Sequence, residues 1–131
     1  MANYKVGIIG CGGIARVHAQ AYQQDKDTEI VCCSDIREEA VAKFGDEFNI
    51  PQSSRYTDHR VMLEKEKPDI VSVCTWHGSH ANITIDACNA GVKGVLCEKP
   101  IATNLRDADA MLESASANGT KLIIGHQGRF S

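Results

Sequence analysis

The sequence has few aromatic residues and lacks both a long apolar run and a concentration of basic residues. Only 5% of its 131 residues are Phe, Trp or Tyr, so the core is expected to consist of Val, Ile, Leu and Ala. No apolar run approaches the roughly 18–20 residues of a membrane helix, and glycines interrupt the apolar start of the chain, so neither membrane insertion nor a signal peptide is expected. The net charge is −3 with acids and bases interspersed, which argues against nucleic-acid binding.

The cysteines do not follow any metal-binding or redox spacing. No C-x-x-C pattern is present, which leaves a zinc ribbon or a thioredoxin motif without support. Neighbouring Cys32 and Cys33 would point to opposite faces of a strand and form a poor disulfide pair. Most of the six cysteines lie in apolar runs, so we expect buried, reduced thiols and a cytoplasmic protein.

Apolar segments of strand length alternate with segments of helical composition. Strands are expected at Lys5–Ile9, Glu29–Ser34, Ser53–Tyr56, Asp69–Thr75, Gly94–Cys97 and Lys121–Gly125. Helices are expected at Ile14–Gln24, Arg37–Phe48, Asp58–Lys65 and Ala81–Ala90, and from Asn104 to the stop at Gly119. This alternation predicts an α/β fold: one domain with a doubly wound parallel sheet in three layers, αβα.

A glycine-rich segment connects the first expected strand to the first expected helix. Its sequence GCGGIA, residues 10–15, fits the pattern G-x-G-x-x-G/A, which is weak alone but gains weight between a strand and a helix. Gly10 would permit the tight turn, Gly12 would let the backbone approach a pyrophosphate, and Ala15 would keep helix and strand close. The free N–H groups of the helix start would bind the anion, so the segment predicts a dinucleotide site. No Gly-Lys-Ser/Thr follows the loop, which excludes a P-loop NTPase.

An aspartate follows the second strand at the spacing of a ribose-binding acid. Asp35 lies 20 residues after Ala15, where a carboxylate would bind the hydroxyls of the adenosine ribose. The alternative is a helix-capping aspartate, because Glu38 would complete a capping box. A carboxylate within about 4–5 Å of a 2′-phosphate would repel it by several kcal/mol, which favours NAD over NADP. Arg37 would either lie solvated in the first turn or bind a 2′-phosphate, so NADP stays possible.

The segment AGVKGVLCEKP, Ala90–Pro100, carries a more specific resemblance. A dinucleotide-binding fold whose fifth strand ends in Glu-Lys-Pro resembles the N-terminal NAD(P)-binding Rossmann domain of the Gfo/Idh/MocA oxidoreductases, the glucose–fructose oxidoreductase and inositol dehydrogenase family. GCGGIARVH at 10–18, YTD at 56–58 and the segment Cys74–His80 are similar to the same family. The similarity spans essentially all 131 residues, but Trp76 stands where the family commonly has proline.

The resemblance implies roles for residues that follow the fourth and fifth strands. Lys99 would lie near the nicotinamide and the reacting carbinol, where a partly desolvated amine takes part in proton transfer or polarises the oxygen. The alternative is a structural ion pair between Glu98 and Lys99 ahead of Pro100. His80 would either cap the helix that it precedes or line the nicotinamide side of the crevice. Trp76 would pack against the nicotinamide or cover the sheet edge.

These expectations define one site at one edge of the sheet. The catalytic residue is Lys99, and the cofactor-binding residues are Gly10, Gly12, Gly13, Ile14, Ala15, Asp35, Arg37, Thr75, His80 and Glu98. Most of them follow the carboxyl ends of expected strands, which is where ligands bind in doubly wound sheets. His18 is expected to be a packing or surface residue and His59 an ordinary helix-start residue, while His126 and Arg129 would face the crevice or begin a second domain. No metal site is expected.

The expected function is hydride transfer between NAD, or NADP, and a secondary alcohol or carbonyl of a sugar, cyclitol or related polyol. Residues 1–125 would form the dinucleotide-binding domain, and residues 126–131 would begin the crossing to a C-terminal domain absent from this chain. In the family that domain supplies most substrate contacts and much of the oligomer interface. The chain alone is therefore expected to bind NAD weakly with no appreciable turnover, and the full-length form to be a homo-oligomer.

Two other functions share parts of this pattern. The first is a non-catalytic dinucleotide-binding or redox-sensing module, in which the helix N-terminus lowers the pKa of the Cys11 thiol. The second is a methyltransferase that uses S-adenosylmethionine, which is disfavoured because residues Glu98–Pro100 have no role there. Titration with NAD, NADP and S-adenosylmethionine distinguishes the three.

Overall fold

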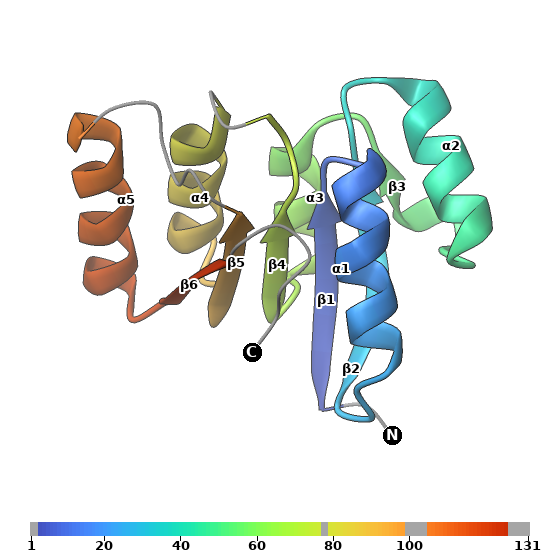
Figure 1. Cartoon of the computed structure of the whole chain (residues 1–131), viewed down its shortest axis with the longest axis horizontal. Helices are drawn as coiled ribbons and strands as arrows, with labels where there is room; N and C mark the ends of the chain where they lie inside the picture. The colour runs from blue at the N-terminus through green and yellow to red at the C-terminus, as the bar shows by residue number, and fades with distance from the viewer. Residues whose placement is uncertain (1–2, 77–78, 99–104, 126–131) are drawn as a thin grey trace.

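The computed structural model describes residues 3–76, 79–98 and 105–125, and these form a parallel sheet between two layers of helices (Figure 1). The strands are β1 (Tyr4–Ile9), β2 (Thr28–Ser34), β3 (Arg55–Tyr56), β4 (Ile70–Val73), β5 (Gly94–Glu98) and β6 (Lys121–Gly125). The helices are α1 (Gly13–Gln23), α2 (Glu38–Glu47), α3 (His59–Glu66), α4 (His80–Asn89) and α5 (Leu105–Asn118), with one 3-10 turn at Gln52–Ser54. The predicted α/β fold is confirmed.

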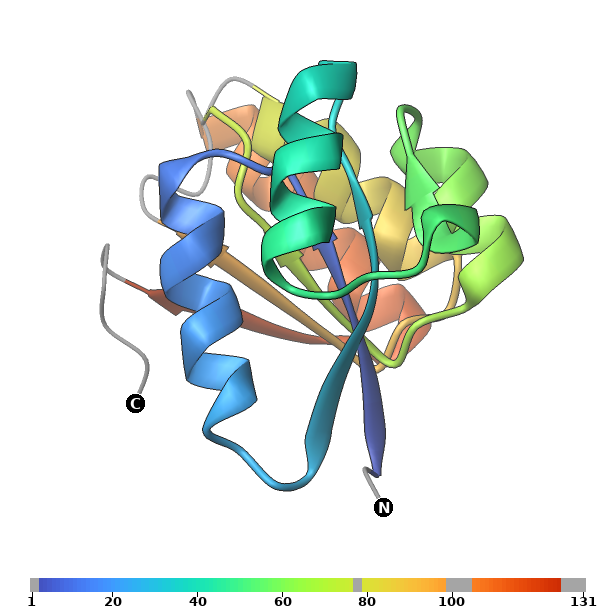
Figure 2. The ribbon, with the colours of Figure 1, turned by 90° about the vertical axis from the view of Figure 1, so that its right-hand side faces the viewer.

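The strand order is β3-β2-β1-β4-β5-β6, and every pair is parallel. The chain starts at β1 in the middle, moves outward to β3, then returns to β4 and moves outward the other way to β6. The reversal between β1 and β4 opens a crevice at the carboxyl ends of the strands, because the two connections leave in opposite directions. Figure 2 shows the twist of the strands beneath α1 and α2.

Two apolar cores form on the two faces of the sheet because successive strand residues point to opposite sides. On the face of α1 and α2, the core includes Val6, Ile8, Ala15, Ala19, Val41 and Phe44. On the face of α3, α4 and α5, it includes Ile9, Met62, Val71, Val73, Ala87, Val95 and Met111. Aliphatic residues and the small residues Ala, Cys and Gly let the helices pack closely on the strands, as the low aromatic content predicts.

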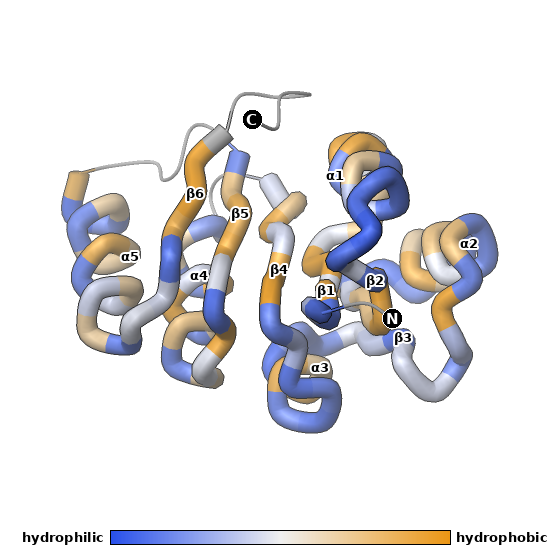
Figure 3. Tube along the Cα trace, turned by 90° about the horizontal axis from the view of Figure 1, so that it is seen from below, coloured by the Kyte–Doolittle hydropathy of each residue, from blue (hydrophilic) through white to orange (hydrophobic). Residues whose placement is uncertain are grey.

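The two helical layers do not cover the sheet equally. Figure 3 looks along the strands and shows α3, α4 and α5 beneath the sheet, with α1 and α2 above the part near β1 and β2. Among the described residues, no helix lies over β5 and β6 on the α1 side. A cleft of about 440 Å³ lies there, lined by residues of α1, β5 and β6 that include Tyr22, Leu96 and Ile123.

Several element boundaries agree with the sequence-based expectations. Asp58 caps α3, since its carboxylate accepts a hydrogen bond from the Arg60 N–H at 2.9 Å. Gly91 and Gly119 follow α4 and α5 with φ of 87° and 68°, the left-handed conformation that ends helices. The last strand, Lys121–Gly125, is found as predicted. Asn104, the expected start of α5, lies outside the described residues.

Two strand predictions were too long. The third strand was expected over Ser53–Tyr56, but only Arg55–Tyr56 pairs with β2. Pro51 begins a 3-10 turn in which the Ser54 N–H donates to the Pro51 carbonyl at 2.9 Å, so the chain straightens only after Ser54. The strand expected at Asp69–Thr75 is limited to Ile70–Val73.

All six cysteines are free and buried, which confirms the expectation of unpaired interior thiols. Among the described residues, no helix is both long and apolar enough to cross a membrane.

Candidate functional site

A cleft of about 550 Å³ opens at the carboxyl edge of the sheet, beside the point where the strand order reverses. It is lined by Ile9, Gly10, Gly12, Ser34, Asp35, Ile36, Arg37, His59, Cys74, Thr75, Trp76, Ser79, Asn82 and Ile83. The structure thus brings the glycine loop, the acid after β2 and the segment after β4 together, although they are far apart in the sequence.

Gly10 is the one position of the glycine loop where no other residue fits. Its φ is +92°, a conformation that L side chains rarely adopt. A Cβ on Gly10 would also lie 2.7 Å from the Cys74 carbonyl carbon and 2.8 Å from the Thr75 nitrogen. Since both are backbone atoms held by the β1–β4 pairing, they have no room to move. Gly10 therefore lets the chain turn from β1 into α1 directly against the end of β4.

The following residues present the start of α1 to open space. Gly12 occupies the cap position, where it supplies no side-chain oxygen to the first-turn N–H groups. A Cβ on Gly12 would meet only the Arg37 side chain at 3.9 Å, and one on Gly13 would meet nothing within 4 Å. Ala15 is fully buried between α1 and the sheet. The helix start, including Gly13 and Ile14, is thus open to an anion while Ala15 keeps the helix close to β1.

The Asp35 carboxylate joins the glycine loop to the start of α2. Its Oδ2 accepts a hydrogen bond from the Cys11 N–H at 2.8 Å, and its Oδ1 accepts one from the Arg37 N–H at 2.9 Å. Burial opposes ionisation, but the hydrogen bonds from Arg37 and from the Cys11 N–H outweigh it and lower the pKa of Asp35. An ionised carboxylate therefore stands at the edge of the cleft at neutral pH.

Arg37 lies at the mouth of the cleft and pairs with Asp35. Its Nε and Nη2 each lie 3.3 Å from a carboxylate oxygen, and its side chain is 57% exposed. Arg37 itself is the cap residue of α2 and makes no side-chain cap bond, so the Asp35–Glu38 capping box considered as an alternative does not form. Both side chains of the pair face the cleft instead.

Thr75 and His80 organise the segment that follows β4. The Thr75 carbonyl lies 2.8 Å from His80 Nε2, and a carbonyl can only accept, so Nε2 carries the proton. His80 Nδ1 is then an acceptor, and the Cys97 thiol lies 3.3 Å from it. Burial raises the pKa of Cys97 to about 12, which keeps the S–H donor in place.

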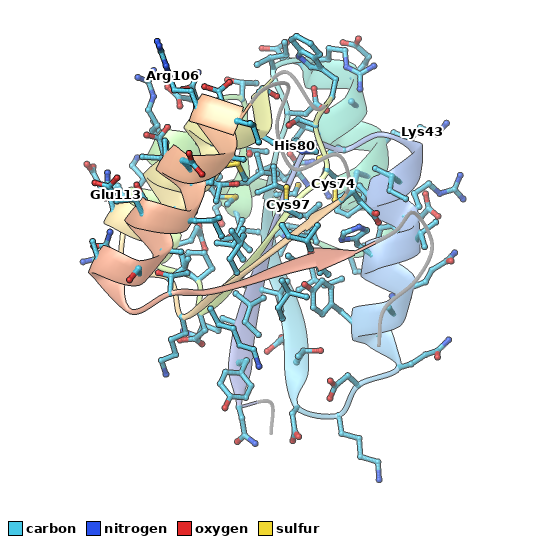
Figure 4. All side chains as sticks on the ribbon, turned by 60° about the vertical axis from the view of Figure 1, so that its left-hand side comes forward. Lys43, Cys74, His80, Cys97, Arg106 and Glu113 are labelled. Atoms are coloured by element: carbon cyan, nitrogen blue, oxygen red, sulfur yellow. The ribbon has the colours of Figure 1, made fainter. Side chains whose placement is uncertain are left out.

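His80 is 2% exposed and does not line the cleft, whereas Thr75 does. Figure 4 shows His80 close to Cys74 and Cys97 near the ends of β4 and β5. His80 is the first residue of α4. Its side chain therefore links this helix to the loop after β4 and to β5, on the side away from the cleft. This arrangement differs from both expected roles, capping of α4 and lining of the crevice, because the His80 side chain bonds the loop that precedes the helix.

Some cleft residues were not singled out from the sequence. Ile36 is 88% exposed and lines the cleft directly after Asp35, where an apolar side chain had no evident reason to lie in solvent. His59, expected to be an ordinary helix-start residue, lines the cleft and bonds Asp86 through Nε2 at 2.7 Å. Trp76 also lines the cleft and is 72% exposed.

A second polar group lies behind the cleft, between α1 and the strands β4 and β5. His18 is fully buried, and its two ring nitrogens lie 3.0 Å from Ser72 Oγ and 2.9 Å from Glu98 Oε1. The Tyr22 hydroxyl continues the chain to Ser72 Oγ at 2.7 Å. The signals for this group were the single serine in the apolar run DIVSVCT and a histidine on the apolar face of α1. His18 is a packing residue, as expected, but one with two specific polar partners.

Two buried polar atoms at the carboxyl edge have no hydrogen-bond partner among the described residues. They are Ser34 Oγ, on the last residue of β2, and Glu98 Oε2, on the last residue of β5. Buried polar groups are normally paired, so unpaired ones at a ligand-binding edge fit contacts to a bound molecule. Lys99, the expected catalytic residue, and Pro100 lie outside the described residues, as do His126 and Arg129.

Cys11 does not have the lowered thiol pKa that the redox-sensing alternative required. The neighbouring Cys33 thiol and burial together raise the pKa of Cys11, and the Asp35 carboxylate adds to the effect. The Cys11 thiol is 8% exposed and donates to the Ser34 carbonyl at 3.4 Å. Burial and these neighbours therefore disfavour the Cys11 thiolate. Among the described residues, no cluster of His, Cys, Asp or Glu could hold a metal ion.

The family model described as the oxidoreductase family with an NAD-binding Rossmann fold matches residues 4–126. This chain belongs to that family. The match includes every described strand and helix, and it confirms the Gfo/Idh/MocA resemblance and the Rossmann fold. The open helix start after Gly12, the Asp35 carboxylate and the cleft beside them fit a dinucleotide of this class.

Named relatives and solved structures agree with this assignment. The chain is 31% identical over 126 residues to myo-inositol 2-dehydrogenase of Thermotoga maritima, covering 96% of the chain and 37% of that protein. It is 34% identical over 128 residues to D-glucoside 3-dehydrogenase of Escherichia coli, covering 97% and 36%. The crystal structure of an oxidoreductase from Agrobacterium radiobacter in complex with NAD+, L-tartaric acid and magnesium superposes with a TM-score of 0.87 at 28% identity, covering 94% and 35%. The chain thus spans little more than a third of the length of these relatives.

Proposed function

We propose that this chain is the dinucleotide-binding part of an enzyme that transfers a hydride between NAD and a secondary alcohol or carbonyl of a sugar, cyclitol or related polyol. The observation that supports it most is the direct bond between the glycine loop and the Asp35 carboxylate at 2.8 Å on one side of the cleft. This bond places the acid expected at the ribose beside the loop expected at the pyrophosphate. The dehydrogenase names of the relatives support the substrate class.

The cofactor assignment to NAD rests on the charge of Asp35. A lowered pKa keeps this carboxylate ionised at neutral pH, so it accepts hydrogen bonds from two ribose hydroxyls and repels a 2′-phosphate. Arg37 supplies the opposite charge next to it, but the Asp35 carboxylate already engages two of its nitrogens. Binding of NADP therefore requires Arg37 to leave Asp35.

Each part of the dinucleotide and the reaction is assigned to different residues of the chain. The start of α1 binds the pyrophosphate, Asp35 binds the adenosine ribose, and Thr75 with Glu98 borders the nicotinamide half. NAD supplies the hydride acceptor when bound. Lys99 takes the proton of the alcohol, because oxidation of a carbinol by hydride loss leaves an O–H proton to be removed.

The organisation of the whole protein is part of the same proposal. Residues 1–125 form the dinucleotide-binding domain, and residues 126–131 begin a crossing to a domain that supplies substrate contacts and an oligomer interface. Six free, buried cysteines favour a reducing compartment, which we propose is the cytoplasm.

Isothermal titration of this chain with NAD, NADP and S-adenosylmethionine tests the cofactor. We expect NAD to bind more tightly than NADP and S-adenosylmethionine not to bind. Tighter binding of S-adenosylmethionine would indicate a methyltransferase and overturn the proposal. The reaction is tested with Lys99→Ala in a protein that includes the substrate domain, where loss of polyol oxidation with retained NAD binding is expected. Unchanged turnover would favour a non-catalytic binding module instead.

A further inference from the structure

We propose that His18 is a positioning residue for the nicotinamide half of the dinucleotide site and acts through Glu98. The inference rests on the proposed function, because a nicotinamide half exists only if the chain binds NAD. His18 lies in α1, the helix that begins at the glycine loop, and Glu98 is the last residue of β5. Their contact joins two elements that border the cofactor from different sides of the sheet reversal.

The contact is built in the interior of the domain. His18 is fully buried and Glu98 is 7% exposed, and His18 Nε2 lies 2.9 Å from Glu98 Oε1. Cys97 points toward α4, so Glu98, the next residue of the strand, points to the opposite face, where α1 lies. The two side chains are 0% and 10% exposed, so the geometry of the Glu98 carboxylate depends mainly on its protein partners.

The hydrogen-bond chain around His18 has one consistent direction. With Glu98 Oε1 as the acceptor, His18 Nε2 carries a proton and donates to it. Burial lowers the pKa of His18 more than Glu98 raises it, so the ring is neutral and Nδ1 accepts from the Ser72 hydroxyl at 3.0 Å. Tyr22 in turn donates to Ser72 Oγ at 2.7 Å. The chain thus fixes the ring and aims one N–H at Glu98.

The position of Glu98 explains why its orientation matters for the cofactor. Asp35 follows β2, on the half of the sheet that binds the adenosine, so the β4–β5 half is left for the nicotinamide. Glu98 Oε2, the carboxylate oxygen that His18 does not bind, has no partner among the described residues. By holding Oε1, His18 sets the direction of Oε2.

Two substitutions of similar size separate positioning from packing. The amide of His18→Gln reaches the place of Nε2 and can still donate to Glu98. The shorter amide of His18→Asn reaches the place of Nδ1, so it keeps a partner for Ser72 and loses the one for Glu98. Both replace a buried ring by a smaller polar group, so a role in packing alone predicts parallel losses.

The experiment measures binding of NADH and of ADP-ribose, which lacks the nicotinamide, to the full chain by titration and by NADH fluorescence. We expect His18→Asn to weaken NADH binding about five- to tenfold and to remove the nicotinamide emission change, with ADP-ribose binding within about twofold of wild type. His18→Gln is expected to retain NADH binding and the emission change.

Parallel losses of NADH and ADP-ribose binding in His18→Asn, or equal NADH losses in both His18 variants, overturn the inference and leave the proposed function intact. Unchanged NADH binding in His18→Asn also overturns it. If His18→Asn does not fold, His18→Leu replaces it in the contrast with His18→Gln, because leucine fills a similar volume and donates no hydrogen bond to Glu98. Absence of NADH binding by the wild-type chain overturns the proposed function and this inference with it.

Discussion

Asp35 and Arg37 form a closed pair in which the carboxylate accepts from the Arg37 backbone N–H at 2.9 Å and from Nε and Nη2 at 3.3 Å each. Asp58 and Arg60 repeat this arrangement at the start of α3, with distances of 2.9, 3.3 and 3.2 Å. Only the first pair also accepts the Cys11 N–H and lines the cleft. The molecule therefore contains two pairs of matched local geometry, of which one lies at the cleft and the other away from it.

Asp35→Asn is expected to weaken NAD binding about tenfold, because one charge-assisted hydrogen bond to the ribose contributes about 1.5 kcal/mol or more. Asp58→Asn changes the same local arrangement away from the cleft and is expected to leave NAD binding unchanged. Isothermal titration of both variants measures the difference. Equal affinities of the two variants for NAD would contradict the role given to Asp35.

Asp35→Ser is expected to shift the preference toward NADP, because it removes the repulsive charge and releases Arg37. The gain should depend on Arg37, so the double variant Asp35→Ser/Arg37→Ala should lose most of it. A ratio of NADP to NAD affinity determined for the single and double variants measures this coupling. An NADP gain that persists without Arg37 would show that repulsion by Asp35 acts alone.

The stabilising contribution of Asp35 is expected to disappear in acid. Its pKa in the folded chain is below the ordinary value of 3.8, so folding favours the ionised form. That contribution is complete well above pH 3.8 and is lost as the pH falls through the folded pKa. Urea unfolding of wild type and Asp35→Asn between pH 7 and pH 3 should show a difference in the free energy of unfolding that narrows only below about pH 4. A difference in the free energy of unfolding that grows as the pH falls would contradict a lowered pKa of Asp35.

Gly10→Ala is expected to lower the free energy of unfolding by roughly 2–4 kcal/mol, from the strained φ and the contact with the Cys74 backbone. Gly13→Ala is the control, because a Cβ there meets nothing within 4 Å and alanine favours the helix. Urea unfolding followed by circular dichroism measures both. Similar losses for the two variants would be inconsistent with the close approach of Gly10 to β4.

The cysteines are expected to react with a thiol reagent only after unfolding. All six are buried, and the pKa of Cys11 in the glycine loop is raised, so little thiolate is exposed at pH 8. Absorbance of released thionitrobenzoate in buffer and in urea counts the accessible thiols. Rapid modification of Cys11 in the folded chain, found by mass spectrometry of its peptides, would revive a redox-sensing role.

The sequence was sufficient for the parts of the site that depend on backbone conformation. Gly10 and Asp35 occupy their places because a tight turn and a parallel strand order restrict where they can lie, and both restrictions are visible as spacing. Arg37 could not be assigned from spacing, because its long side chain reaches either solvent or Asp35 and only the structure gives the pairing.

The contacts between distant segments were the part that the sequence did not reveal. His18 and Glu98 lie 80 residues apart, and their pairing depends on the register of α1 over β4 and β5. The sequence left open whether His18 packs in the interior or lies on the surface, and it gave no information on the partner. The short strand β3 was also overestimated, because a 3-10 turn and a strand of two residues leave similar polar patterns.

The uncovered side of β5 and β6 affects how this chain behaves in solution. β6 is the edge strand of the sheet formed by the described residues, and its apolar side chains include Ile123, which is 42% exposed. Exposed edge strands can pair with the strands of other chains, and charged residues on the edge oppose such pairing. Lys121, at the start of β6, supplies one such charge. Self-association through β6 would bury this face and stabilise the folded chain by mass action. Unfolding midpoints are therefore expected to rise with protein concentration, and variants should be compared at one dilute concentration.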